Sequence, residues 1–411
     1  MTVINHSFMK IPDFAFKNWL KFILVSLAVL ILGKNAKAQE PEEPYRISLI
    51  TCDPGDELYS TFGHSAIRVV DHNSGRDLVF NYGTFDFNTP FFYVKFVRRT
   101  LDYQLSVTTF EQFLYEYEYF QRNVREQVLD LSPEQQRMVM DFLRTNYLPE
   151  NRKYRYDFFY DNCSTRIRDF MQTLFGDQLQ WNEREDPPSK TFRELIDEYV
   201  YPLPWSDLGI DLALGAVIDV EATEWEKQFL PDYLEAAFDR ATLLGDGPSR
   251  ALVKERNVIY EFPERERGGM NLLNPYLIFW LFGLVIGILT FKGFKSKKLY
   301  LGLDIGIFSV LGLLGMLITF MWFFTEHSQT KNNWNILWAF PLHLLLVYGL
   351  VNPKVWIRKG LMGALILADL ALVFWILGLQ SFHPSIMPLL LVIILRTNFL
   401  YYNLNRWKIH H

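Results

Sequence analysis

The pattern of apolar and polar positions divides the chain into two parts. Residues 40–265 alternate between short apolar runs and charged segments, whereas apolar runs long enough to cross a bilayer recur after residue 272. The pattern predicts a soluble domain of residues 39–265 and a membrane domain of residues 266–411. Transmembrane helices are expected at five places in the second part, namely 272–291, 299–324, 336–351, 361–379 and 386–402.

A shorter apolar stretch near the N-terminus has the order of a secretory signal. Lys17 and Lys21 precede apolar residues 22–32, and the small residues Ala36 and Ala38 follow. The stretch is about half as long as a spanning helix needs, which favours cleavage after Ala38 over retention as an anchor. Residues 1–38 are therefore expected to be a signal peptide, and either outcome places the following domain outside the cytoplasm.

Basic residues are distributed unevenly among the loops that join the expected spans. They cluster after the first, third and fifth spans, as Lys292, Lys295, Lys297, Lys298, Lys354, Arg358, Lys359, Arg406 and Lys408. Because Lys and Arg accumulate on the cytoplasmic side, the sequence predicts a multi-pass protein of the bacterial inner membrane with its N-terminal domain in the periplasm. Arg396 lies inside the last apolar run, where a charge marks either a span end or a polar pocket.

Within the soluble part, alternation of period two predicts strands and capping motifs predict helices. Strands are expected at 45–50, 64–70, 77–82, 125–131 and 251–262, with a further strand-like run at 154–160. Helices are expected at 109–121, 132–147, 189–200 and 222–242. In the second strand, His64, Ala66 and Arg68 share one face, so His64 is expected to look over a small residue toward a polar space. The mixture predicts an α+β domain followed by an all-α membrane domain.

The candidate chemistry centres on Cys163, which follows Asn162 where a helical pattern begins. A helix N-terminus lowers the pKa of a thiol, and a neutral imidazole such as that of His64 can accept the thiol proton. Asp161 or Asn162 is expected to cap this helix and to leave further backbone N–H groups free for a thiolate or an oxyanion. Two plainer interpretations stay open: Cys163 is the first core residue of its helix, or it forms a disulfide with Cys52.

Composition excludes other classes of function. The chain has 50% hydrophobic and 16% aromatic residues and a formal net charge of -5, which argues against nucleic-acid binding. The sequence contains no glycine-rich phosphate loop, and its histidines show no metal-ligand spacing. Neither a cofactor nor a metal is expected.

Three segments resemble known families. The order of a strand with His64, a further strand and an Asn-Cys pair at a helix start resembles the circularly permuted papain-like branch of the NlpC-type superfamily. Residues 52–69, 81–83 and 161–164 more closely resemble the Lnb-type lipoprotein N-acyltransferases of the Bacteroidota. The resemblance implies that Cys163 is the nucleophile and His64 its base. Papain-like sites also use a third polar group to hold the imidazole, and Asn81 is the candidate unless a register slip puts Tyr82 in its place.

Further residues are candidates for binding substrate. They are Arg68, Tyr82, Asn162, Ser164, His327, Asn332 and His383. Arg68 is expected to form an ion pair with a carboxylate such as Asp86, or else to bind a phosphate. Two loops are expected to face outward: the first outward loop, residues 325–335, contains His327 and Asn332, and the second, residues 380–385, contains His383. These side chains either bind a lipid headgroup or a peptide terminus or belong to an interfacial belt.

The resemblance implies a lipoprotein N-acyltransferase. Such an enzyme moves an acyl chain from a membrane phospholipid, through a Cys163 thioester, to the α-amine of a diacylglyceryl-cysteine lipoprotein. Its partners are the phospholipid donor, the lipoprotein N-terminus and the bilayer. The alternatives are an envelope thiol peptidase or amidase that acts on peptidoglycan, and an inactive membrane sensor with a Cys52–Cys163 disulfide.

Overall fold

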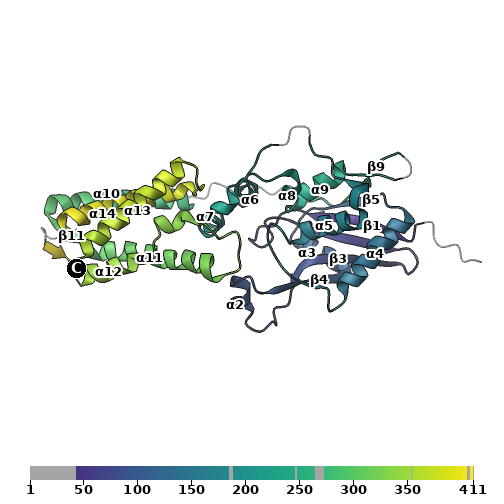
Figure 1. The fold of residues 1–411 in the computed structure, drawn as a ribbon, viewed down its shortest axis with the longest axis horizontal. Helices are drawn as coiled ribbons and strands as arrows, with labels where there is room; N and C mark the ends of the chain where they lie inside the picture. Colours follow the sequence, from purple (N-terminus) through teal and green to yellow (C-terminus); the bar gives the residue numbers. More distant parts are fainter. Residues whose placement is uncertain are drawn as a thin grey trace, which may run out of the picture.

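A computed structural model describes residues 43–184, 188–245, 248–263, 273–352, 354–404 and 408–410. The molecule is elongated, with a β-sheet domain at one end and a helical bundle at the other (Figure 1). The expected signal peptide, residues 1–38, lies outside the described residues, as does the expected domain boundary at residues 265 and 266.

The N-terminal domain is built on one antiparallel sheet of seven strands, in the order β10-β5-β1-β2-β3-β4-β6. The strands are β1 (Tyr45–Cys52), β2 (His64–Asp71), β3 (Arg76–Phe85), β4 (Asp102–Thr109), β5 (Val124–Leu129), β6 (Lys153–Arg155) and β10 (Val253–Tyr260). The expected α+β class is confirmed, and the main strands lie where the alternation placed them. The strand-like run at 154–160 is shorter than expected, because only its first residues join the sheet.

Helices cover both faces of this sheet. One face packs against α4 (Pro133–Tyr147), α5 (Cys163–Phe175) and α9 (Pro231–Arg240), and this core contains Ile67, Val69, Ile167 and Met171. The other face packs against α3 (Phe110–Tyr119), whose Phe113 and Tyr117 cover Ala66. The expectation that the His64 face looks onto a polar space is therefore wrong, because α3 seals that face with aromatic rings.

Shorter elements complete the domain. They are α2 (Phe92–Val97), α6 (Phe192–Val200), α7 (Pro204–Ala213), α8 (Glu224–Lys227), η1 (Gly176–Gln178), η2 (Ala216–Ile218) and a small sheet of β7 (Leu179–Gln180), β8 (Thr242–Leu243) and β9 (Arg250–Ala251). The single helix expected at 222–242 is two helices, α8 and α9. Pro231 explains the break, because a proline starts a helix readily but cannot donate the N–H that would continue one.

The C-terminal part contains four long apolar helices among the described residues. They are α10 (Pro275–Ser296), α11 (Leu301–Phe324), α13 (Ile357–Ile376) and the pair formed by η4 (Pro384–Ile386) and α14 (Met387–Asn403). The third expected span is not one helix. It consists of η3 (Trp334–Leu337) and the short α12 (His343–Val351), and it runs from the domain end of the bundle to the opposite end (Figure 1).

Pro341 lies in the gap between η3 and α12, where a continuous helix would need its missing N–H. Side chains provide hydrogen-bond partners beside this break. His343 Nε2 lies 3.0 Å from the backbone carbonyl of Trp338, and Trp338 Nε1 donates to Asn335 Oδ1 at 2.9 Å. Such local partners allow irregular backbone at membrane depth. The prediction that this apolar run belongs to the membrane part was correct, but the prediction that it forms one continuous helix was wrong.

Arg396 is fully buried inside the bundle. Its guanidinium donates to both carboxylate oxygens of Asp304 at 2.7 Å and to the Thr290 hydroxyl at 2.9 Å, so three helices meet at this charge. Arg396 therefore marks a polar pocket rather than a span end. At the same end of the bundle, β11 (Lys298–Tyr300) pairs with β12 (Lys408–His410).

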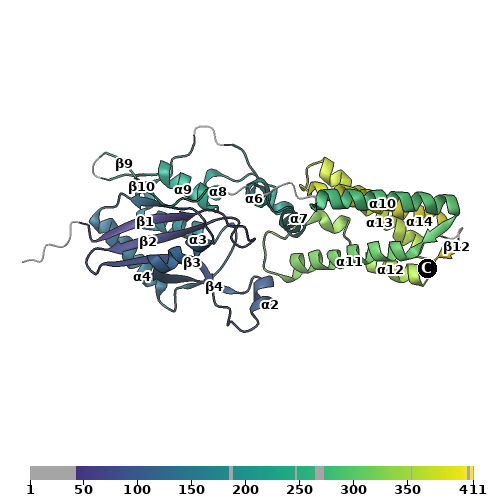
Figure 2. The ribbon, with the colours of Figure 1, turned by 180° about the vertical axis from the view of Figure 1, so that it is seen from behind.

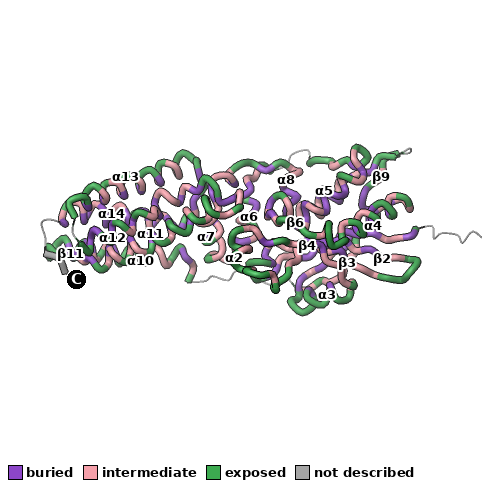
Figure 3. Tube along the Cα trace, turned by 60° about the horizontal axis from the view of Figure 1, so that its bottom comes forward, coloured by how far each residue is buried: buried purple, intermediate pink, exposed green. Residues whose placement is uncertain are grey.

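The domain and the bundle share a core through α7. Leu208 of α7 is buried in the same apolar cluster as Phe308, Trp338 and Ile393 of the bundle. Seen from behind, α7 lies at the mouth of the bundle between α6 and α11 (Figure 2). Colouring by burial shows that most residues of α2 are exposed, near the same junction (Figure 3).

Candidate active site

The structure brings Cys163, His64 and Asn81 together at one end of the sheet. Cys163 is the first residue of α5, His64 is the first residue of β2, and Asn81 lies on β3. The imidazole Nε2 of His64 lies 2.6 Å from Asn81 Oδ1. A carbonyl oxygen only accepts, so Nε2 carries a proton and Nδ1 is left for the hydrogen bond that joins His64 to the Cys163 thiol.

Two glycines with left-handed backbone shape this junction. Gly63, directly before His64, has φ +76, and a Cβ there would lie 2.7 Å from the Cys52 carbonyl oxygen. Gly83 has φ +91 at the irregular part of β3, and its position for a Cβ lies 3.9 Å from Cys163 Cβ. Because other residues adopt such φ values only with strain, both glycines fix the backbone beside the thiol and the imidazole.

Asn162 is the N-cap of α5, as expected, but it leaves fewer free groups than expected. Its Oδ1 accepts from the N–H groups of Ser164 and Thr165 at 2.8 and 2.9 Å, and its Nδ2 donates to the carbonyls of Phe158 and Phe229 at 2.7 and 2.8 Å. Among the described contacts, only the Cys163 N–H of the first turn stays unbonded. The expectation of several free N–H groups is wrong, and the buried Asn162 is fully engaged in holding the helix start.

A buried pair of serines joins the strand of the imidazole to the helix of the thiol. The hydroxyls of Ser65 and Ser164 lie 3.0 Å apart, and both residues are fully buried. The Ser65 backbone also hydrogen-bonds the Cys163 sulfur, and the Ser164 hydroxyl lies 3.9 Å from it. Ser164 therefore contacts the Cys163 sulfur from inside the fold, and its own side chain is buried.

The electrostatics favour a thiolate and an imidazolium. Burial raises the pKa of Cys163, but the adjacent His64, its hydrogen bond and the bonds from Ser65 and Ser164 outweigh burial and lower that pKa. Burial disfavours the charged form of His64, yet Cys163 and the hydrogen bonds to Cys163 and Asn81 raise its pKa. Each group stabilises the charged form of the other, which is the condition for a nucleophilic sulfur at neutral pH.

Cys52 has the opposite surroundings. It is fully buried behind α3 and pairs with His64 in the register of β1 and β2. Burial raises its pKa to about 12, in spite of a hydrogen bond to Tyr117. Both cysteines are free, so the structure contains no Cys52–Cys163 disulfide. Cys52 behaves as a core residue rather than as a second reactive thiol.

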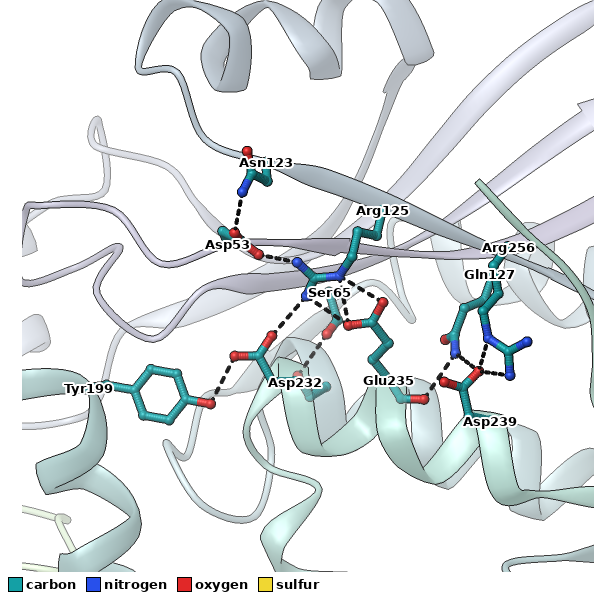
Figure 4. A network of polar contacts seen from close by, with 11 residues as sticks. Asp53, Ser65, Asn123, Arg125, Gln127, Tyr199, Asp232, Glu235, Asp239 and Arg256 are labelled. Atoms are coloured by element: carbon teal, nitrogen blue, oxygen red, sulfur yellow. Dashed lines mark hydrogen bonds and ion pairs between the residues drawn. The ribbon is translucent and has the colours of Figure 1, made fainter. Parts of the chain in front are cut away.

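Behind the site, an ion network fixes the loop between β1 and β2. Arg125 lies at its centre and binds the carboxylates of Asp53, Asp232 and Glu235 (Figure 4). Asp53 directly follows β1, while Asp232 and Glu235 belong to α9, which begins two residues after the Phe229 carbonyl that anchors Asn162. The network thus connects the loop that leads to His64 with the segment that holds the cap of the Cys163 helix.

Arg68 and Tyr82 have structural contacts in place of open binding surfaces. Arg68 binds both oxygens of Asp77 at 2.9 and 2.6 Å and one oxygen of Glu126 at 3.0 Å, so the expected partner Asp86 is wrong. Tyr82 points into the core, where its hydroxyl donates to Asn146 at 2.6 Å. The register has not slipped, because Asn81 faces His64 and Tyr82 the opposite side.

The first outward loop docks onto the domain. His327 Nε2 lies 3.1 Å from the Val97 carbonyl, and the Asn332 carbonyl accepts from the Ala216 N–H at 3.0 Å. The next residue, Asn333, donates to the carbonyls of Leu212 and Ala213. These groups form hydrogen bonds with the N-terminal domain, so the loop is a contact between the two parts rather than an interfacial belt. The side chain of Asn332 is exposed.

His383 of the second outward loop meets two acidic residues of α7. Ligand atoms of Asp207, Asp211 and His383 lie within 4.8 Å of one another, a grouping that the sequence spacing did not indicate. His383 Nδ1 accepts from the Ser385 N–H at 3.1 Å, so in the neutral ring Nε2 carries the proton, and it lies 3.4 Å from Asp207. Asp211 is paired with Arg193. This set fits hydrogen bonding between α7 and the loop better than it fits a metal.

Sequence reasoning missed Asp157, which links the site to the membrane part. Its carboxylate accepts from the Phe159 and Tyr160 N–H groups at 2.9 and 3.0 Å, and also binds Arg99 and Gln329. Asp157 lies only six positions before Cys163 in the printed sequence. The alternation of period two suggested a strand there, and no local pattern indicated partners that are distant along the chain.

Comparisons with known proteins agree with this architecture. Residues 35–198 match the family description Lnb N-terminal periplasmic domain, and residues 266–407 match Lnb transmembrane domain. Neither a curated protein nor a solved structure gave a significant match. The two matches follow one another in the order of the two structural parts and together cover most of the chain. The protein is thus a membrane protein with a periplasmic N-terminal domain, and it belongs to the Lnb-type family of lipoprotein-processing proteins.

Proposed function

We propose that this protein is a lipoprotein N-acyltransferase with Cys163 as its nucleophile. The observation that carries the proposal is the contact between a thiol of lowered pKa and an imidazole of raised pKa that Asn81 orients. This arrangement activates sulfur for attack on an acyl carbonyl. The family match adds a lipoprotein context and a membrane.

We also propose that the N-terminal domain has a circularly permuted papain-like fold. A thiol at a helix start, an imidazole on a strand and an amide oxygen on the next strand are the functional groups of papain-like sites. Here His64 and Asn81 precede Cys163 along the chain, and α5 packs on the sheet that carries them. This set of groups supports a chemistry shared with thiol acyl enzymes.

In the first half-reaction, the Cys163 thiolate attacks the carbonyl carbon of a phospholipid acyl ester. The carbonyl oxygen becomes an oxyanion beside the free Cys163 N–H. Collapse breaks the ester bond, and the His64 imidazolium gives its proton to the departing glycerol oxygen. The products are a lysophospholipid, a thioester at Cys163 and a neutral His64.

In the second half-reaction, the free α-amine of a diacylglyceryl-cysteine lipoprotein attacks the thioester carbonyl. Neutral His64 accepts a proton from the nitrogen as the carbon–sulfur bond breaks. The amide product leaves, and the thiolate and imidazolium are restored. Both substrates reside in the outer leaflet of the bacterial inner membrane, which accounts for a thiol domain tethered to spans.

The decisive test follows the acyl group. A strain that depends on this protein, carrying Cys163→Ala, is expected to show no N-acylated lipoprotein by mass spectrometry, while the protein is still inserted and folded. Cys52→Ala is the matched control, because it removes the other thiol, which lies in the core behind α3, and leaves Cys163 in place. The wild type incubated with phospholipid should yield an acyl adduct mapped to Cys163.

The same experiment decides between acyl transfer and the envelope peptidase alternative. Persistent N-acylation in the Cys163→Ala strain would overturn the proposed function. Altered muropeptides together with unchanged lipoproteins would favour a peptidoglycan amidase.

A further inference from the structure

The segment between β3 and β4, residues 86–101, exposes a concentration of large apolar side chains. Phe87 is 72% exposed, Phe91 79% and Tyr93 78%, and Val94, Phe96 and Val97 are also exposed. The helix α2 in its middle has no buried residue. An exposed apolar surface of this kind marks a site that contacts a protein or a membrane.

The backbone of this segment is strained where the aromatic side chains project. Phe91, the N-cap of α2, has φ 59, and Arg99, one residue beyond the C-cap Arg98, has φ 58, so both residues lie in the left-handed region. A bulky residue such as Phe91 adopts this conformation at a cost of roughly 1–3 kcal/mol, which persists only where the surroundings impose it. Phe91, in this conformation, and Tyr93 both expose their rings at the start of α2.

The segment is anchored directly to the end of a membrane span. The Glu326 N–H donates to the Arg98 carbonyl at 3.1 Å, and His327 Nε2 lies 3.1 Å from the Val97 carbonyl. Glu326 and His327 follow Phe324, the last residue of α11. Because a residue extends the chain by at most about 3.6 Å, Val97 lies within roughly 15 Å of the end of that span. This bound keeps α2 near the end of the span, close to the level at which the headgroup region begins.

Two views of the molecule agree with this placement. Figures 1 and 2 both show α2 at the end of the domain that faces the bundle, beside the outer end of α11. Lys95 and Arg98 are the basic side chains of the segment nearest the aromatic ones, and Arg98 is exposed; Asp86 is the acidic one. Aromatic rings combined with cationic side chains suit an interface that carries anionic lipid.

We propose that residues 86–97 insert into the outer leaflet of the membrane in which the spans lie. The occupant of the exposed apolar surface is therefore the lipid bilayer. Phe87, Phe91 and Tyr93 enter the interface, while Lys95 and Arg98 contact phosphate headgroups. The inserted segment holds the domain against the surface of the bilayer.

The proposed insertion also brings the bilayer to the side of the domain from which aromatic rings extend to the thiol. Aromatic rings continue from the exposed surface into the domain: Phe85 lies 5.0 Å from Phe87 and 5.2 Å from Tyr103, and Tyr103 stacks on Tyr156 at 4.5 Å. The Tyr156 hydroxyl interacts electrostatically with Cys163. This last step, unlike the insertion itself, rests on the proposed acyl transfer. In that reaction an acyl chain approaches the thiol from the side of the domain where these aromatic rings lie.

Photocrosslinking tests the insertion without using activity. The full-length protein is reconstituted in vesicles of phosphatidylethanolamine and phosphatidylglycerol that contain a phospholipid with a diazirine in its acyl chain. Mass spectrometry then maps the lipid adducts. We expect adducts on residues 86–97 as well as on the spans, in both the wild type and Cys163→Ala. Tyr115 and Tyr119 of α3, each 72% exposed, are the matched internal control, because no hydrogen bond among the described residues joins α3 to a span end.

A double variant sharpens the test. Phe91→Ser with Tyr93→Ser is expected to lower the adduct yield in this segment by about tenfold, since burial of an aromatic side chain contributes at least that factor to transfer from water. Tyr115→Ser with Tyr119→Ser should leave the yield unchanged. Adducts at 86–97 no more frequent than at 115–119 would overturn the inference. Lipid adducts without any acyl transfer would instead retain the insertion and reject the proposed function.

Discussion

The Gln329 side-chain amide donates to the Asp157 carboxylate at 2.7 Å, and this bond joins the first outward loop of the membrane part to the turn that leads into Cys163. The same oxygen accepts from the Phe159 and Tyr160 N–H groups, so it also shapes that turn. Arg99 neutralises the carboxylate from the segment that carries α2. One buried side chain thus contacts the membrane part, the proposed lipid-contacting segment and the approach to the nucleophile.

Asp157→Asn is expected to lower the rate of acyl transfer by about a hundredfold, because misplacing a nucleophile by about 1 Å costs that factor. The asparagine keeps the size of the side chain but loses the charge that Arg99 requires. Asp157 acts through the turn, so kcat should fall more than KM rises, and alkylation of Cys163 should slow as well.

The control for this variant is Ser328→Ala, which removes only a 3.4 Å contact to the same carboxylate. Wild-type kcat in folded Asp157→Asn protein would contradict the positioning role. Thermal unfolding of both variants separates a displaced turn from a general loss of stability.

The reactivity of Cys163 should depend on pH in a way set by His64. The pKa of the thiol is lowered from its ordinary value of 9.0, so alkylation by iodoacetamide should continue at pH values where an ordinary thiol is largely protonated. In His64→Ala the largest influence that lowers the thiol pKa is gone and only the hydrogen bonds from Ser65 and Ser164 oppose burial, so the midpoint of the alkylation profile should move to higher pH. The rate is measured by mass spectrometry of the Cys163 peptide, and identical midpoints would refute the coupling.

Thiol counting should distinguish the two cysteines. Folded protein is expected to react at Cys163 only, because Cys52 is fully buried and its pKa is raised to about 12. After unfolding in detergent and denaturant, both thiols should react without prior reduction. A requirement for reductant would revive the disulfide interpretation and the inactive sensor.

Asp197 should make the stability of the domain depend on pH. Burial and the charges of Asp211 and Asp207 raise its pKa from 3.8 to about 7, and its Oδ1 is buried without a hydrogen bond. The folded state therefore binds a proton more tightly than the unfolded chain, so stability falls as pH rises from about 4 to about 7 and stays reduced above that.

Asp197→Asn removes this charge. The variant should have a higher Tm than the wild type at pH 8, and the difference should shrink toward pH 4. Thermal unfolding in detergent at a series of pH values measures both. Glu198→Gln is a matched surface control on the same helix, and a constant difference in Tm across pH would contradict the assignment.

The sequence was sufficient for those features that depend on neighbours along the chain. Period-two alternation located the main strands, and the cap at Asn162 is a local motif of side chain and backbone. His64 and Asn81 could be placed on one side of adjacent strands because side-chain direction follows from the pleat. The bilayer-length apolar runs were equally visible, since they depend on composition alone.

Other features depend on partners that no local pattern reveals. Asp157 and Gln329 are 172 positions apart, and Arg68 pairs with Asp77 and, across the sheet, with Glu126 rather than with Asp86. The helix α3 folds over the His64 face although the strand pattern alone indicated an open side. The break at Pro341 lies within a uniformly apolar run, where hydropathy does not distinguish a helix from irregular backbone that neighbouring helices surround.

The pair of Arg396 and Asp304 has a consequence for biosynthesis. During synthesis Asp304, in the first turn of α11, leaves the ribosome long before Arg396, which pairs with it in the complete bundle. A chain that stops before α14 lacks the Arg396 guanidinium, so both carboxylate oxygens of Asp304 lose the partner that they have in the complete bundle. The polar contact between α10, α11 and α14 therefore forms only after the last helix has been made.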